Sequence, residues 1–144
     1  MKPDGKKHLS RSARNTVWCL AGCAAGDLGA IAFFERAYAP DGPPRELWTV
    51  VWIVAMVSGI ATSVLLETFV LWKQFGPWEA FRTAVGMSMV SMLLMEAAMN
   101  VADYGMMGKP AINLAILPVT LGVGFLAAWP YNLWRLSRHG KCCH

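Results

Sequence analysis

The chain has 9 Met among its 144 residues, and most of them lie in one apolar segment. Thioethers and thiolates prefer Cu(I) among the common biological metals, so methionines on one helix face would form a soft-metal site. Successive helical residues turn by about 100°. One face then carries Met89, Met92, Glu96, Met99, Asn100 and Asp103, with Met95 at its edge. The alternative interpretation is packing, because Met fills irregular gaps well.

Cysteines in two other places could bind the same class of metal. Cys19 and Cys23 are four residues apart and therefore share a helix face, which Asp27 continues. The C-terminal sequence Cys142-Cys143-His144 offers two thiols and an imidazole. A buried Cys also behaves as a small hydrophobe, so packing is again the alternative for the first pair.

Three carboxylic acids, Asp27, Glu67 and Glu96, lie inside apolar segments. A charged group at the centre of a bilayer costs at least ~2.5–3.5 kcal/mol, so these positions need an explanation. The functional interpretation is a staggered proton or cation path. It would have Glu67 nearest the cytoplasm, Asp27 near the midplane and Glu96 in the outer half. The alternative is that neutral acids hold the helices together through hydrogen bonds.

Together these groups predict a small membrane protein that binds and transports a soft metal ion, most plausibly Cu(I). The outer ligands would be Met92, Met95, Glu96 and Met99. The middle of the path would be Met89, Asp27 and Cys23. The inner ligands would be Cys19, Cys142, Cys143 and His144, which would hand the ion to a cytoplasmic metal acceptor. Two alternatives remain open: a structural or regulatory membrane protein without transport, and a proton-coupled carrier of a small solute.

Four apolar segments must position these groups, at about 15–38, 47–72, 78–104 and 111–136. About 20 apolar residues cross a bilayer as a helix. The chain is 56% hydrophobic and 15% charged, which leaves no room for a large soluble domain. We therefore predict an all-α, integral membrane four-helix bundle over 15–136. A basic tail, 1–14, precedes it and a Cys/His tail, 137–144, follows it. All three His lie in the tails and the sequence has no catalytic triad, so we predict no enzyme.

Basic residues predict the orientation of this bundle. Ten Lys and Arg fall in or within a few residues of the two tails and the second gap, against three in or near the other gaps. The positive-inside rule then places both termini in the cytoplasm, as an even number of spans also requires. The net charge of +4 follows from this bias, so we expect the lipid bilayer as partner and no nucleic acid.

Three short sequences resemble a prokaryotic membrane family catalogued as domain of unknown function 4396. They are Trp18-Cys19-Leu20-Ala21-Gly22-Cys23-Ala24-Ala25-Gly26-Asp27, Glu96-Ala97-Ala98-Met99-Asn100 and Trp129-Pro130-Tyr131-Asn132. The resemblance covers residues 15–144 and implies a multi-pass protein of four helices in the plasma (inner) membrane of a prokaryote. It implies no activity.

The last two segments and the tail also resemble the end of CTR-type copper transporters. The matching positions are Met95 and Met99, then Gly122 and Gly124, then Cys142, Cys143 and His144. The first segment has no counterpart in that family, and Gly124-x3-Ala128 replaces its Gly-x3-Gly pattern. The resemblance implies a Cu(I) pore formed by a homo-oligomer, a trimer.

Overall fold

Helices form nearly all of the structure, a computed structural model that describes the backbone of residues 3–139 and the side chains of residues 9–139 except 74, 75, 87, 136 and 139. The long helices are α1 (Pro3–Ala37), α2 (Trp48–Phe75), α3 (Pro77–Met107) and α4 (Leu117–His139). One turn of 3-10 helix, η1 (Arg45–Leu47), precedes α2. The described part of the chain has no strand, which confirms the predicted all-α class.

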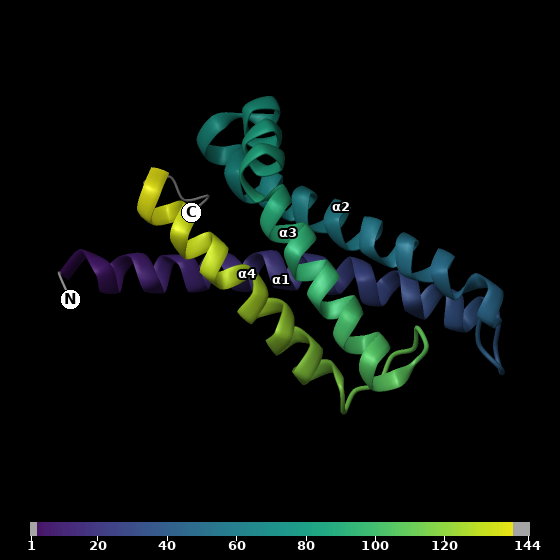
Figure 1. The fold of residues 1–144 in the computed structure, drawn as a ribbon. Coiled ribbons are helices and arrows are strands. Elements are labelled where there is room, and N and C mark those ends of the chain that lie inside the picture. Colours follow the sequence, from purple (N-terminus) through teal and green to yellow (C-terminus); the bar gives the residue numbers. More distant parts are fainter. Residues whose placement is uncertain (1–2, 140–144) are drawn as a thin grey trace.

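The four long helices pack so that each contacts the next along the chain, and the last contacts the first (Figure 1). Helix α1 makes its most extensive contact with α2, α3 packs against α2 and α4, and α4 returns to pack against α1. The start of α1 and the end of α4 lie toward the same end of the molecule. Contact between α1 and α3 is smaller and is made by side chains at the centre of the bundle.

Glycines with positive φ end two of these helices. Gly76 (φ 78°) caps α2, and Pro77 at the first position of α3 starts the next helix at once. Gly108 (φ 67°) caps α3 in the left-handed region, a conformation that costs glycine nothing because it lacks a Cβ. These local signals explain why α2 and α3 are separated by a single residue.

Two helical stretches are long and apolar enough to cross a membrane, Leu9–Ala37 and Arg45–Lys73. A third is possible if the two parts of α3, Pro77–Gly86 and Ser88–Met107, count as one span, although they are bent by 52°. The predicted fourth span over 111–136 remains a prediction. Its helix begins only at Leu117, because the Asn113 side chain accepts a hydrogen bond from the Ala115 N–H and holds the preceding turn.

The surface and the centre of the bundle have the distribution expected in lipid. Large apolar side chains point outward, with Phe33, Phe69 and Val101 exposed at 68%, 70% and 72%. The buried positions are instead occupied by sulfur-bearing, small and polar residues. In a bilayer, polar side chains face the interior of the bundle, so a functional site is expected in this interior.

Candidate functional site

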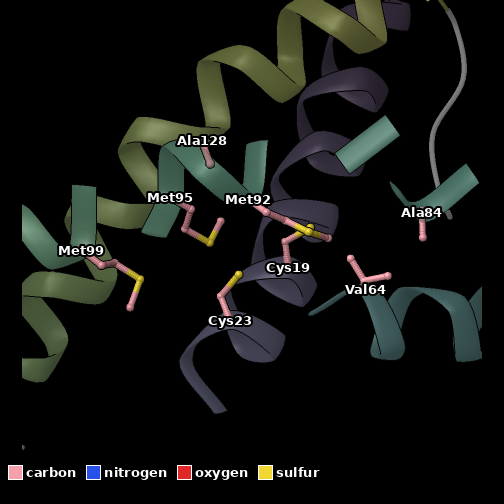
Figure 2. Packing of buried hydrophobic residues seen from close by; sticks show 8 residues of the cluster. All are labelled: Cys19, Cys23, Val64, Ala84, Met92, Met95, Met99 and Ala128. Atoms are coloured by element: carbon pink, nitrogen blue, oxygen red, sulfur yellow. The ribbon is translucent and has the colours of Figure 1, made fainter. Parts of the chain in front are cut away.

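Five sulfur-bearing side chains meet in one buried cluster between α1 and α3 (Figure 2). They are Cys19, Cys23, Met92, Met95 and Met99, here called the sulfur cluster. Each is 3% exposed or less. The structure therefore brings together the two segments that the sequence singled out, although they lie about seventy residues apart. Neither Cys19 nor Cys23 is part of a disulfide among the described residues.

Helical spacing and small neighbours position these sulfurs. The cysteines are one turn apart on α1, and the methionines at i, i+3 and i+7 share one face of α3. Helix α4 closes the cluster with Gly124 and Ala128. A Cβ added at Gly124 would lie 2.6 Å from Met99 Cγ and 2.9 Å from Met99 Sδ, so glycine is needed for the close approach of α4.

The buried face of α3 is centred differently from the predicted one. Met95, expected at its edge, is fully buried, whereas Met89 is only half-buried and lies outside the sulfur cluster. Periodicity gives the width of an apolar face, but the helices packed against it decide its centre. Here α3 also bends between Gly86 and Ser88, just before Met89.

Glu67 lies at one end of the sulfur cluster and links three helices. From its place on α2 it accepts hydrogen bonds from Cys19 Sγ on α1 and from Ser88 Oγ on α3, the latter at 2.6 Å. Arg135 on α4 is close enough to act on this carboxyl electrostatically. Arg82, in the first turns of α3, is exposed. Ser88 and Arg135 were missed because both are distant in the chain from Glu67.

Glu96 is fully buried beside the Cys23 thiol and the backbone of Gly59. A Cβ at Gly59 would overlap Glu96 Oε1, so this glycine leaves the space that the carboxyl fills. The Cys23 thiol is the hydrogen-bonding neighbour of the Glu96 carboxyl, whereas Asp27 Oδ1 has no partner among the described residues. Asp27 in turn lies within electrostatic range of Glu96 and Asp103.

The acids therefore follow α1 one turn at a time. Glu67 is level with Cys19, Glu96 is level with Cys23, and Asp27 is the next turn, each step rising about 6 Å. This is a staggered series, but Asp27 and Glu96 stand in the opposite order from the predicted one. A rise of about 1.5 Å per residue along straight helices gives the predicted depths of the acids in the membrane. It takes no account of the bend in α3 or of the length of the Glu96 side chain.

Among the side chains that the structure describes, no three His, Cys, Asp or Glu residues converge as a metal-binding group. The predicted ligands Cys142, Cys143 and His144 lie outside the described residues.

Residues 9–141 match the family described as Domain of unknown function (DUF4396). The chain belongs to this family. No curated protein and no solved structure matches it. The DUF4396 match contains all of the sulfur cluster and the series of acids, so in this chain both lie within the family domain.

Proposed function

We propose that this DUF4396 protein binds Cu(I) and moves it across the plasma membrane of a prokaryote, and that it is not an enzyme. One observation carries the proposal: the sulfurs of Cys19, Cys23, Met92, Met95 and Met99 share one buried cluster. Soft thioether and thiol ligands favour Cu(I), and the resemblance of Met95 and Met99 to the CTR-type pore supports the same cargo.

Conduction requires several binding sites that are each weak enough to release the ion. Single thioethers meet this requirement, and the methionines step along α3 by one turn or less. An ion entering at Met99 would pass Met95 and Met92 and reach the thiols of Cys23 and Cys19. Glu96 and Asp27 lie beside this route, and their charge would stabilise a cation in a medium of low dielectric constant.

In this proposal the ion leaves past Glu67 toward the cytoplasmic tail. Cys142, Cys143 and His144 would receive it there and pass it to a cytoplasmic acceptor. The trimer implied by the CTR resemblance is part of the proposal. Met89 would take part only as a neighbour of the route, because it lies outside the sulfur cluster.

We expect the double variant Met95→Ala, Met99→Ala to lose most of its bound copper and its copper uptake. The protein would be purified anaerobically for elemental analysis, and uptake would be measured in cells expressing equal amounts. Met106→Ala is the matched control, because Met106 is on the same helix but 43% exposed. Equal uptake by the wild type and the double variant would exclude the proposed route.

A proton-coupled carrier is the second candidate, favoured by two buried acids, Glu96 beside the Cys23 thiol and Asp27, whose Oδ1 has no partner among the described residues. Glu96→Gln belongs in the same assays. Loss of a proton-driven activity in Glu96→Gln, with no copper bound by the wild type, would favour the carrier. Folded wild-type protein that neither binds metal nor transports would indicate the third alternative, a structural or regulatory role.

A further inference from the structure

A second buried polar region lies between α1 and α4, nearer the described ends of the chain than the sulfur cluster. Asn132 Nδ2 on α4 donates to Thr16 Oγ1 on α1 at 2.9 Å, and Thr16 Oγ1 donates to the Ser12 carbonyl at 2.9 Å. Ser12 and Thr16 are 1% and 0% exposed. We call this region, with Trp129 and Arg135 on the same stretch of α4, the terminal seam.

Three buried polar atoms of the terminal seam have no hydrogen-bond partner among the described residues: Ser12 Oγ, Trp129 Nε1 and Arg135 Nη1. Groups of this kind are normally satisfied by protein or by ordered water. They recur along one face of α4 and the facing turns of α1. An apolar ligand would leave them all unsatisfied, so the region calls for a polar occupant.

The charges of the terminal seam decide which polar occupant fits. Arg135 and Glu67 lie within electrostatic range of each other, so groups of opposite polarity border this region and it does not select strongly for an ion of either sign. Water can both donate and accept, and a buried water typically bonds to two to four polar groups of this kind.

We infer that water enters the bundle along the terminal seam and reaches Glu67. We place the inner end of this water path at Glu67, because beyond it the sulfur cluster packs against the apolar side chains of Val64, Ala84 and Ala128. The bundle would thus be wet from one end up to Glu67. The inference does not depend on copper, since the same water would serve any cargo or a purely structural bundle.

Thiol probes test the inference. Ser12→Cys and Thr16→Cys are made with Cys142→Ser and Cys143→Ser, and the rate of reaction with 2-aminoethyl methanethiosulfonate is measured in opened membranes. Val17→Cys is the matched control, because Val17 is next to Thr16 but 53% exposed on the lipid-facing side. Thiols react as thiolates, which need water, so Ser12→Cys and Thr16→Cys should react at least about tenfold faster than Val17→Cys.

Ser10→Cys, exposed two residues before Ser12 on α1, checks that the reagent reaches this end of the protein. A Thr16→Cys rate equal to that of Val17→Cys, with Ser10→Cys reacting, would overturn the inference. If Thr16→Cys fails to fold, radiolytic oxidation of the wild type decides instead. Oxidised Trp129 with protected Met95 supports the water path, and protected Trp129 overturns it. Neither result requires copper, so the two proposals fail separately.

Discussion

Glu67 shows how one buried carboxyl can organise this bundle. It accepts hydrogen bonds from Cys19 and Ser88, which belong to two different helices, while Arg135 faces it from a third. A carboxylate has no donor of its own, so it suits a position where two donors converge. The identity of this residue therefore matters for both the packing and the charge of the centre.

We expect Glu67→Gln to lower the free energy of unfolding in detergent by about 1 kcal/mol. An amide offers one oxygen and one NH2, so one of the two converging donors would face another donor, and hydrogen bonds between membrane helices average about 0.6 kcal/mol with a maximum near 1.7. Glu79→Gln is the control, because Glu79 is exposed in the first turn of α3. Equal unfolding curves for both variants would show that these hydrogen bonds contribute little.

At the scale of the helices, the contact between α1 and α2 depends on two glycines of α1. A Cβ added at Gly22 would lie 2.7 Å from Ser63 Cα, and one added at Gly26 would overlap Thr62 Oγ1 and the Ser58 carbonyl. Thr62 Oγ1 uses this proximity to donate to the Gly22 carbonyl at 2.8 Å. The pair thus forms the close-packing seam that Gly22-x3-Gly26 suggests.

Gly26→Ala should destabilise the bundle by about 1–3 kcal/mol, because backbone atoms of α2 would have to move. Gly29→Ala is the matched control, since a Cβ there would meet nothing within 4 Å. Alanine at that position should be neutral or stabilise the helix by up to about 1 kcal/mol. The measurement is thermal unfolding of both variants in the same detergent, and a stable Gly26→Ala would show that α2 can shift without cost.

The described part of the chain presents large apolar side chains outward and buries several polar ones, as expected for a lipid solvent. Its helices give two candidate spans, and a third if the bent pair in α3 counts as one span. The number of spans decides whether the two ends of the chain lie on the same side of the membrane. If there are four, the bias of basic residues predicts that both ends lie in the cytoplasm.

Orientation is tested by labelling introduced cysteines in intact cells with an impermeant maleimide. Lys109→Cys, exposed in the connection between α3 and α4, should be labelled from outside, and Ser10→Cys should be labelled only after the cells are opened. Ser10→Cys labelled in intact cells would reverse the orientation. The native Cys142 and Cys143 report on the C-terminal end in the same assay. If only one end of the chain were labelled in intact cells, the number of spans would be odd.

The sequence by itself determined what depends on neighbouring residues. Apolar runs predicted the all-α class, and the spacing of Cys19 and Cys23 placed both thiols on one face. Each of these follows from backbone geometry over a few residues, which side-chain type controls directly. The same reasoning placed Met92, Met95 and Met99 on or beside one face of α3.

Only the tertiary structure decided which faces meet. Periodicity cannot rotate one helix against another, so it could not show that Cys19 donates to Glu67, that Arg135 faces the same carboxyl, or that Met89 lies outside the sulfur cluster. Periodicity also could not predict that α4 starts at Leu117. The loop before α4 is held partly by Glu35, whose carboxyl accepts a hydrogen bond from the Ile112 N–H. Such contacts join residues far apart in the chain, and close packing of all four helices selects them together.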